Sequence, residues 1–304
     1  MYLGSVRFFK HVIYLTMTLV VGAALLGIYT LTIQLNGSFF TKTAGAAAAE
    51  EFNLPPQEPL LEPPEETQPD NTITLNVTKM DYQQSYPELY AVPAEQFRSG
   101  TKTAYLTFDD GPSARTPEIL DILKEHDVKA TFFVLTKDSD PDILRRIVEE
   151  GHAIGIHTHT HRYGEIYASV EAFLADLQAA YEVIYRATSV KPEIVRFPGG
   201  SINSYNRGIY QELIAEVLRR GFLYYDWNIS TVDTLPNVAP KEVVHNVLAN
   251  VEGKDNLFIL AHDSSNKKNT AKALPEIITS LKELGYVFDK IDNSVEPVVF
   301  AYPQ

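Results

Sequence analysis

The chain has 304 residues, a net charge of −13 and no cysteine. Without cysteine it has no disulfide framework and no thiolate metal site, so any bound metal must take nitrogen and oxygen ligands. The acidic balance argues against a nucleic-acid partner, because phosphate binding needs a basic surface. The length fits one large domain or two small ones.

The N-terminus has the pattern of a membrane segment. Residues 12–33 contain no charged residue, and about 20 apolar residues are enough to cross a bilayer as a helix. Arg7 and Lys10 precede this run and no acidic residue does, which predicts that residues 1–11 stay cytoplasmic and the remainder is exported. We therefore predict a single-pass signal-anchor in the cell membrane with the rest of the chain extracytoplasmic. The alternative is a secreted protein cleaved near Ala49, where small residues offer cleavage sites.

Residues 34–97 have the composition of a linker. Six prolines stand between residues 55 and 69 among Glu and Gln, and large apolar residues are few. Such a segment buries too little apolar surface to offset the entropy lost on ordering, and proline keeps it extended. We predict a disordered Pro-rich and acidic stem, whose more aromatic part from Tyr82 to Val92 packs on the edge of the next domain. That domain is predicted to span residues 98–304.

After Lys102 the sequence alternates between short apolar runs and amphipathic stretches. The runs expected to form strands are Ala104–Phe108, Ala130–Leu135, Ala153–His157, Glu193–Pro198, Phe222–Trp227, Leu257–His262 and Val287–Ile291. Helix starts are expected at Thr116-Pro117, Asp140-Pro141, Ser169, Ala239-Pro240 and Asn269, and helix ends at Gly151, Gly221 and Gly285. Seven β/α alternations predict a parallel sheet covered by helices and closed as a barrel. In that architecture functional residues gather at the carboxyl ends of the strands.

Unusual polar clusters follow the expected strands. They are Asp109-Asp110 after the first, the run from His157 to His161 after the third, Arg196 to Ser201 after the fourth, Asp226-Trp227 and Asp233 after the fifth, and Leu260-Ala261-His262-Asp263 at the sixth. Scattered polar residues would not be expected to sort themselves in this way. The clusters together predict one active site at the carboxyl end of the sheet.

A metal site is predicted among these residues. His157 and His161 are four residues apart and share one face if the chain turns helically after the strand. With the carboxylate of Asp110 they form a His₂Asp set that leaves coordination positions open, as in catalytic zinc sites. A competing set uses His157 and His159, which share a face if the strand continues, with His161 as third ligand.

The remaining polar residues suit hydrolysis. Neighbouring side chains at a strand end point different ways, so Asp109 is available as a general base beside the metal carboxylate. Arg196 is expected to pair with Asp109 and keep it ionised. Gly199 and the next glycine let backbone N–H groups approach an oxyanion. His262 would then protonate the leaving group if Asp233 raises its pKa.

The chain resembles the polysaccharide deacetylases, which are carbohydrate esterases with a NodB-homology domain. The five motifs that carry the resemblance are, in chain order, Thr107-Phe108-Asp109-Asp110-Gly111, His157-Thr158-x-x-His161, Arg196-x-Pro198, Asp226-Trp227 to Asp233, and Leu260-x-His262. The resemblance covers residues 104 to 291 and implies a distorted (β/α)7 barrel. It also implies hydrolysis of N-acetyl groups on amino sugars with a divalent cation, Zn²⁺ first, with Co²⁺ or Mn²⁺ as alternatives.

The resemblance also implies a role for each matching residue, and it decides against His159 as a ligand. The implied roles are metal ligand for Asp110, His157 and His161, base for Asp109, acid for His262, positioning of the base for Arg196, tuning of the acid for Asp233, backbone oxyanion donor for Gly199, and lining of the acetyl pocket for Leu260.

Two positions depart from the family pattern. Many members carry an aromatic residue where this chain has Gly199, but only the backbone N–H is needed there. Many carry a Trp where this chain has Thr234, and that Trp helps to wall the sugar subsite, so the family's substrate preferences do not transfer directly. Trp227, Phe197 and Tyr225 are candidates for the stacking surface instead, although the default expectation for these side chains is core packing.

The sequence therefore predicts an extracytoplasmic, membrane-anchored deacetylase. Its expected partner is an N-acetylated amino-sugar polymer of a cell wall or surface, peptidoglycan-like or chitin-like, from which it releases acetate; no obligate protein partner is indicated. One alternative is a metal-dependent amidase acting on a smaller non-sugar amide. Another is a glycan-binding homologue without turnover, although such homologues usually lack a ligand or the base, and none is missing here.

Overall fold

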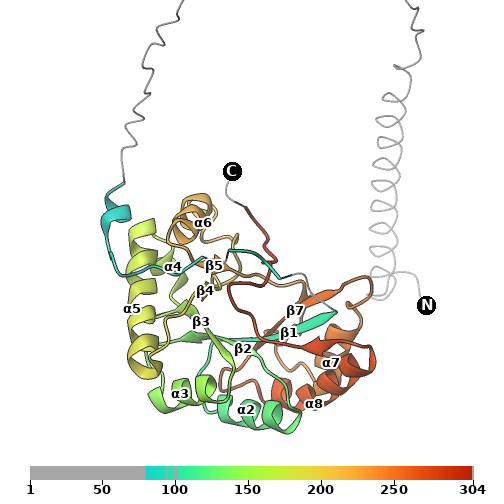
Figure 1. Ribbon diagram of the computed structural model, residues 1–304. Coiled ribbons are helices and arrows are strands. Elements are labelled where there is room, and N and C mark those ends of the chain that lie inside the picture. The colour runs from blue at the N-terminus through green and yellow to red at the C-terminus, as the bar shows by residue number, and fades with distance from the viewer. Residues whose placement is uncertain (1–79, 94, 99–101, 303–304) are drawn as a thin grey trace, which may run out of the picture. The chain divides into compact units, whose positions relative to one another are not determined.

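The computed structural model describes residues 80–93, 95–98 and 102–302 (Figure 1). These residues belong to one compact unit. The predicted cytoplasmic segment, the predicted anchor at residues 12–33 and most of the predicted stem lie outside them. In the described part of the chain no helix combines the length and the apolar character needed to cross a membrane.

Short parallel strands form one sheet in this unit. Their bounds are β1 Thr103–Asp109, β2 Thr131–Leu135, β3 Ala153–Thr158, β4 Ile194–Val195, β5 Leu223–Tyr224, β6 Ile229–Ser230, β7 Asn256–His262 and β8 Val287–Phe288. The order across the sheet is β5-β4-β3-β2-β1-β7-β6, and β8 pairs with the start of β1. The longest pairing is between β1 and β7, whose residues are in register over the whole of both strands. This pairing places the first strand of the domain next to a strand about 150 residues later in the chain.

The sheet is a half-barrel, so the predicted (β/α)7 barrel is found only in part. Within the described residues the two outermost strands, β5 and β6, are not paired with each other. Strand β6 was not expected from the sequence, and it pairs with β7. The last expected strand, Val287–Ile291, shortens to β8. Strand β8 is short because little of β1 is left for it to pair with. β7 pairs along one whole edge of β1 and β2 pairs with the carboxyl end of the other edge, so only the amino end of that edge is available to β8.

Helices pack around this half-barrel (Figure 1). Their bounds are α2 Thr116–Glu125, α3 Pro141–Glu149, α4 Tyr163–Ile166, α5 Val170–Thr188, α6 Tyr210–Arg219, α7 Pro240–Leu248 and α8 Lys268–Glu283, and a 3₁₀ turn, η1, spans Asp81–Gln84. Asp140 and Ser169 cap α3 and α5 with side-chain oxygens that accept backbone N–H bonds. Gly151, Gly221 and Gly285 follow α3, α6 and α8 with φ of 82°, 82° and 83°, a region that glycine enters without steric cost. The predicted helix starts are therefore confirmed to within a residue, and each of these three helices ends two residues before its predicted glycine.

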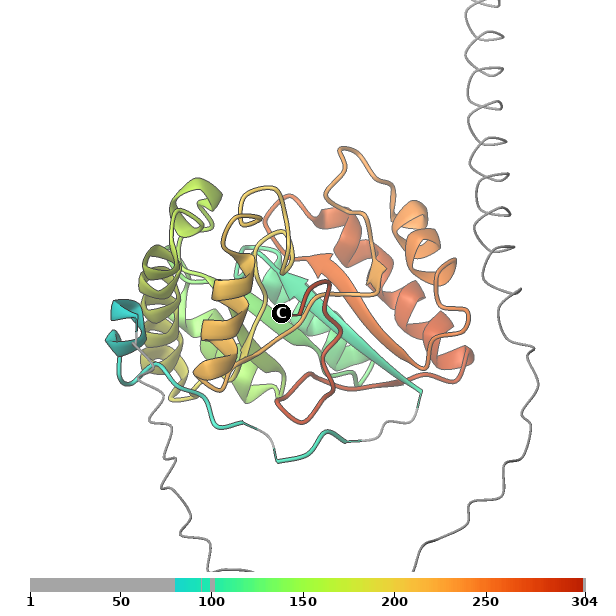
Figure 2. The same ribbon diagram turned by 90° about the horizontal axis from the view of Figure 1, so that it is seen from above.

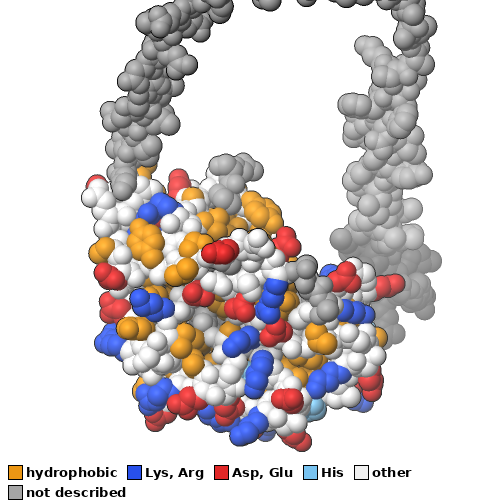
Figure 3. Space-filling model, viewed as in Figure 1, with side chains coloured by type: hydrophobic (Ala, Val, Ile, Leu, Met, Phe, Trp, Pro, Cys, Tyr) orange, Lys and Arg blue, Asp and Glu red, His pale blue; other side chains and the backbone are white. Residues whose placement is uncertain are grey.

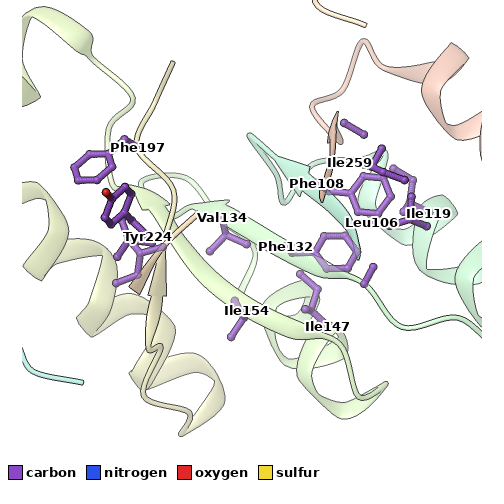
Figure 4. Packing of buried hydrophobic residues seen from close by; sticks show 14 of the residues in the cluster. Leu106, Phe108, Ile119, Phe132, Val134, Ile147, Ile154, Phe197, Tyr224 and Ile259 are labelled. Atoms are coloured by element: carbon purple, nitrogen blue, oxygen red, sulfur yellow. The ribbon is translucent and has the colours of Figure 1, made fainter. Parts of the chain in front are cut away.

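Alternation along the strands divides the side chains between two faces. On β1, Leu106 and Phe108 join the larger core, where they pack with residues of neighbouring strands and helices (Figure 4). Tyr105 belongs instead to a smaller cluster on the concave face, which consists of Tyr105, Phe133, Ile194, Tyr225, Phe258, Ile291 and Val295. Thr107 and Asp109 follow Tyr105 on that same face. The concave face is thus apolar at the amino end of the strands and polar at the carboxyl end.

The chain after β8 closes the open side of the half-barrel. Ile291 and Val295 pack in the inner cluster, and the Tyr225 hydroxyl donates hydrogen bonds to the carbonyls of Asp292 and Val295. Figure 2 shows the C-terminal residues in the middle of the surrounding elements, between α6 and the central strands. This segment therefore packs against several strands of the sheet.

Residues 80–93 pack against α6, as expected for Tyr82 to Val92. The guanidinium of Arg220 is fully buried and pairs with Glu216 at 2.7 Å. It also donates hydrogen bonds to four backbone carbonyls, those of Tyr82, Ser85, Tyr86 and Leu89. The chain consequently enters the domain at a fixed place beside α6.

Acidic and basic side chains are interspersed on the face seen in Figure 3, with hydrophobic side chains among them. Among the exposed large hydrophobic residues are Tyr205, Leu235 and Phe300. Tyr205 follows β4 and Leu235 follows β6, so both come from loops at the carboxyl ends of strands.

Candidate active site

A cavity of about 380 Å³ opens at the carboxyl end of the concave face. Its lining residues are Asp109, Asp110, His157, His161, Tyr163, Gly199, Trp227, Ser230, Thr234, Leu260 and His262. Eight of the ten predicted site residues are in this set, and the other two, Arg196 and Asp233, are buried directly behind it. Strand alternation explains the convergence, since Asp109, His157 and Leu260 occupy inward positions on β1, β3 and β7.

Asp110, His157 and His161 form the predicted metal-ligand cluster. Oδ1 of Asp110 lies 3.5 Å from Nε2 of His157 and 3.3 Å from Nε2 of His161. Two of the three have a left-handed backbone, with φ of 73° at Asp110 and 57° at His161. His159 is not in the cluster: its Nδ1 lies 2.9 Å from the hydroxyl of Thr136. The geometry favours the set with Asp110 over the competing set with His159.

The three side chains fit a divalent cation. Ligand atoms about 2.0–2.1 Å from a tetrahedral zinc stand roughly 3.4 Å apart, which matches the separations found here. Oδ1 of Asp110 is buried and has no hydrogen-bond partner in the described structure. Nδ1–H of His157 donates to the carbonyl of Arg196 at 2.8 Å, which leaves the Nε2 lone pair pointing at the cluster. A buried unpaired carboxylate oxygen beside two imidazole nitrogens is the donor set of a metal site.

Asp176 on α5 holds the loop that carries His161. Its carboxylate accepts hydrogen bonds from the N–H groups of His159 and Thr160 and from the hydroxyl of Thr160. The N–H of His161 also donates a hydrogen bond to the hydroxyl of Thr158. Nothing in the sequence distinguished Asp176 from an ordinary polar residue of an amphipathic helix, so this contact was not predicted.

Arg196 is fully buried beneath the cavity and donates a hydrogen bond to Asp109. One guanidinium nitrogen donates to Oδ1 of Asp109 at 3.0 Å and also to the hydroxyl of Thr107. The other nitrogens donate to the carbonyls of Tyr225 and Asp226, each at 2.9 Å. The guanidinium also lies 4.3 Å from the centre of the Phe133 ring. Every nitrogen is satisfied, so the arginine fixes one carboxylate oxygen of Asp109 and leaves the other directed elsewhere.

His262 and Asp233 form a second charged pair across the cavity. Nδ1–H of His262 donates to Oδ1 of Asp233 at 2.7 Å, and the backbone N–H of His262 donates to Oδ2 at 3.0 Å. Burial alone would lower the pKa of His262, but the hydrogen bond and charge of Asp233 outweigh it, so the pKa is raised above its ordinary value. Conversely, the pKa of Asp233 is lowered, because bonds from His262 and Thr270 overcome its burial. Because Nδ1 is engaged, Nε2 is the nitrogen left for a substrate.

Asp263 follows His262 and packs under the turn after Asp110. The Thr116 hydroxyl donates to its carboxylate at 2.6 Å. A Cβ atom added at Gly111 would stand 2.1 Å from Oδ2 of Asp263, so only glycine fits at that position. Complete burial raises the pKa of Asp263 to about 7.

Tyr163 stands where a side chain at residue 199 would lie. Gly199 has φ of 76°, and a Cβ atom built on it would be 3.1 Å from Cε1 of Tyr163. The Tyr163 ring also contacts His161 edge-on at 5.1 Å and Tyr205 at 5.0 Å. Burial and the nearby Asp110 raise the pKa of Tyr163 to about 12, so its hydroxyl stays neutral. Tyr163 was missed by the sequence analysis, since one tyrosine in a four-residue helix has no distinguishing pattern.

The expected stacking surface is only partly present. Trp227 lines the cavity, but Phe197 and Tyr225 are 1% and 0% exposed and belong to the core. Core packing was the default expectation for both, and it is confirmed: Phe197 packs in the larger core and Tyr225 in the inner cluster. Phe300 supports Trp227 instead, with ring centres 4.8 Å apart, and its N–H donates to the carboxylate of Asp226.

Comparison with known proteins agrees with this site. The family model for polysaccharide deacetylases matches residues 98–217. A peptidoglycan-N-acetylglucosamine deacetylase of Bacillus cereus is 33% identical over 74% of this chain and 83% of its own length. A peptidoglycan-N-acetylmuramic acid deacetylase of Bacillus subtilis is 32% identical over 63% of this chain and 71% of its length.

Solved structures show the same fold. The catalytic domain of a peptidoglycan N-acetylglucosamine deacetylase from Eubacterium rectale superposes with a TM-score of 0.64 at 35% identity. The match covers 71% of this chain and 98% of that domain. Sequence, fold and the residues gathered at the cavity all agree, and the chain belongs to the polysaccharide deacetylase family of hydrolases.

Proposed function

We propose that the enzyme removes N-acetyl groups from amino-sugar residues of a peptidoglycan-like polymer and releases acetate. The observation that carries the proposal is the arrangement of three groups around one cavity. These groups are the cluster of Asp110 and two histidines, the Arg196-bound carboxylate of Asp109, and the His262–Asp233 pair. Relatives named for N-acetylglucosamine and for N-acetylmuramic acid in peptidoglycan support the substrate class and leave the sugar open.

Asp110, His157 and His161 would hold a divalent cation, for which Zn²⁺ suits two imidazoles and one carboxylate. When bound, such an ion supplies Lewis-acid polarisation of an acyl carbonyl and lowers the pKa of a coordinated water. Nδ1–H of His157 on the Arg196 carbonyl orients that imidazole. The loop anchored by Asp176 orients His161.

Asp109 is the proposed general base. Its carboxylate lines the cavity next to Asp110 and is 3% exposed, so little water competes for it. The bond from Arg196 fixes the orientation of the Asp109 carboxylate. In the reaction Asp109 accepts a proton from the attacking water while the water oxygen bonds to the acyl carbon.

Gly199 supplies the proposed oxyanion donor. Its N–H makes no hydrogen bond within the described residues, and the residue lines the cavity. A backbone N–H held in place at the cavity needs little reorganisation, which is why one such donor is worth about 10²–10³ in kcat. Leu260 adds an apolar surface suited to the acetyl methyl group.

His262 is the proposed general acid. The Asp233 carboxylate keeps its pKa raised, and Nε2 is the ring nitrogen that is free to act. When the carbon–nitrogen bond breaks, His262 gives its proton to the departing amine. The products are acetate and a free amino sugar, and the acid and base return to their starting states by exchange with water.

The test is acetate release from purified enzyme and a panel of N-acetylglucosamine oligomers, peptidoglycan fragments and a small non-sugar acetamide. We expect acetate from the sugar polymers and little from the simple amide. Cleavage of the small amide alone would favour the amidase alternative. Binding of oligomers without any acetate release would favour the non-catalytic one.

We further propose that the enzyme works outside the cell, tethered by residues 12–33. The uncharged run and the preceding Arg7 and Lys10 support this. Membrane fractionation of the full chain tests it. A mature N-terminus near Ala49 would contradict the anchor and indicate secretion.

A further inference from the structure

We infer that Tyr167 and Asn203 are positioning residues of the reaction, because together they hold the peptide bond between Pro198 and Gly199 in one orientation. The inference rests on the proposed function, in which the N–H of Gly199 stabilises the oxyanion. Gly199 lines the active-site cavity, whereas Tyr167 and Asn203 do not. The two side chains would therefore act on the reaction only through the backbone that they hold.

The carbonyl of Pro198 accepts two hydrogen bonds from side chains. The hydroxyl of Tyr167 donates to it at 2.8 Å, and Nδ2 of Asn203 donates to it at 3.0 Å. The peptide bond from Pro198 to Gly199 is trans. A trans peptide unit is planar, and its N–H points away from the C=O of the same unit. The bonds that fix the direction of the Pro198 carbonyl therefore also fix the direction of the Gly199 N–H, on the opposite side.

This peptide unit needs support because two glycines follow Pro198. Gly199 and Gly200 have φ of 76° and 90°, and glycine has no side chain that limits the rotation of the backbone. A reversal of the unit between Pro198 and Gly199 would put a carbonyl oxygen where the N–H had been. That oxygen would repel an oxyanion instead of stabilising it. Two hydrogen bonds to the same carbonyl oppose this reversal.

The neighbouring N–H groups of this turn are already engaged. Gly200 donates to the carbonyl of Phe197 at 2.9 Å. Ser201 donates from its N–H and its hydroxyl to the carboxylate of Asp226, at 2.8 and 2.6 Å. The N–H of Gly199, by contrast, has no acceptor within the described residues. Because backbone donors are normally paired, an unpaired one at a cavity is the donor that this turn offers to a ligand.

The two donor side chains are themselves fixed. Tyr167 is 6% exposed, and its ring stacks on that of Phe173 with ring centres 6.1 Å apart. Burial raises the pKa of Tyr167, so the hydroxyl keeps the proton that it donates. Oδ1 of Asn203 accepts hydrogen bonds from the N–H groups of Tyr205 and Asn206, which leaves Nδ2 facing the turn. Since neither donor is free to turn away, the carbonyl between them is held in place.

The kinetic test uses the double variant Tyr167→Phe/Asn203→Asp. Phenylalanine keeps the buried ring, and aspartate keeps the oxygen that accepts two N–H bonds but replaces the donor with a second acceptor. We expect kcat for acetate release from the tetramer of N-acetylglucosamine to fall about 10²-fold with KM nearly unchanged, because the oxyanion exists only in the transition state. Tyr167→Phe alone should lose less, since Asn203 still holds the carbonyl.

The matched control is Tyr286→Phe/Asn250→Asp. It removes the same two kinds of donor, a tyrosine hydroxyl on the carbonyl of Lys254 and an asparagine amide on the carbonyl of Asn246. None of these residues lines the active-site cavity. Its kcat and KM should match those of the unaltered enzyme.

A spectroscopic test reads the same peptide without any turnover. Pro198-Gly199 is the only Pro-Gly pair in the chain. Protein labelled with ¹³C in the proline carbonyls and ¹⁵N in the glycines therefore gives a single HNCO correlation signal, which comes from this peptide unit. Loss of hydrogen bonds to the carbonyl oxygen should move the carbonyl signal upfield in Tyr167→Phe and further in the double variant. The control variant should leave the signal in place.

The outcomes separate the inference from the proposed function. An unchanged kcat in the double variant would overturn the inference and leave the proposed function intact, and so would a lower kcat with an unmoved carbonyl signal. A lower kcat accompanied by loss of metal or of thermal stability would assign the effect to the fold and overturn the positioning role. No acetate from the unaltered enzyme would overturn the proposed function and this inference together.

Discussion

The floor of the active-site cavity and its rim are built in different ways. Asp109, His157 and Arg196 form the floor, are at most 3% exposed, and come from inward positions at the ends of strands. The rim is contributed by the short helix α4, loops and the C-terminal segment, where Tyr205 and Phe300 are 61% and 47% exposed. The floor is fixed by buried hydrogen bonds, so it sets the chemistry. The rim side chains do not touch the reacting group, so we expect them to set the affinity for the proposed polymer and the preference among polymers.

The largest expected effect is at the proposed metal ligands. Asp110→Ala and His161→Ala should each weaken metal binding by more than the roughly 10- to 100-fold typical of losing an outer hydrogen-bonding partner. His159→Ala should keep its metal, because residue 159 faces Thr136 rather than the cluster. Metal content after dialysis, measured by plasma mass spectrometry, checks both. Equal metal loss in the His159 variant would instead favour the competing ligand set of His157, His159 and His161.

Removing the base should cost about 10²-fold or more in kcat while leaving the metal in place. Asp109→Asn keeps the shape and one oxygen that can accept the bond from Arg196, so the buried arginine is not left unpaired. Single-turnover acetate release and metal content measure the two properties, and thermal unfolding shows whether the fold survives. A kcat close to that of the unaltered enzyme would remove Asp109 from the mechanism.

The proposed acid, His262, predicts a shift in the pH profile. His262 must carry a proton to give it to the leaving amine, so activity falls as the pH rises through its pKa. Asp233 raises that pKa, and Asp233→Asn removes the charge that does so. The alkaline limb of the kcat profile should therefore move to lower pH in this variant. A limb that stays in place would show that the pair does not tune the acid.

The smallest expected effect is at the rim. Tyr163→Ala should raise KM for sugar oligomers about fivefold, roughly 1 kcal/mol, with kcat little changed, because the ring contributes contact area rather than chemistry. Tyr163→Phe keeps the ring and should restore KM. Tyr185→Ala, an exposed tyrosine on α5, is the control. A loss in kcat rather than KM would place Tyr163 in the chemical step.

The same division explains how much of the site could be predicted from the sequence. Asp109, His157 and His262 stand at the ends of apolar runs, and the parallel sheet brings such ends together. Tyr163 and Asp176 reach the site from helices, through contacts that leave no local pattern. Likewise, the two-residue strand β6 is too short to show a period, and β4 and β5 are shorter than the runs predicted for them, so the open side of the half-barrel was not foreseen.

The contact between Phe300 and Trp227 ties the last described residues of the chain to the active-site cavity. The N–H groups of Phe300 and Ala301 donate to the Asp226 carboxylate and the Ser201 hydroxyl, so these residues lie beside Trp227 at the cavity. An affinity tag or fusion partner joined after residue 302 would begin close to Trp227 and the active-site cavity. A partner joined before residue 80 would instead emerge near α6, where Arg220 fastens the chain.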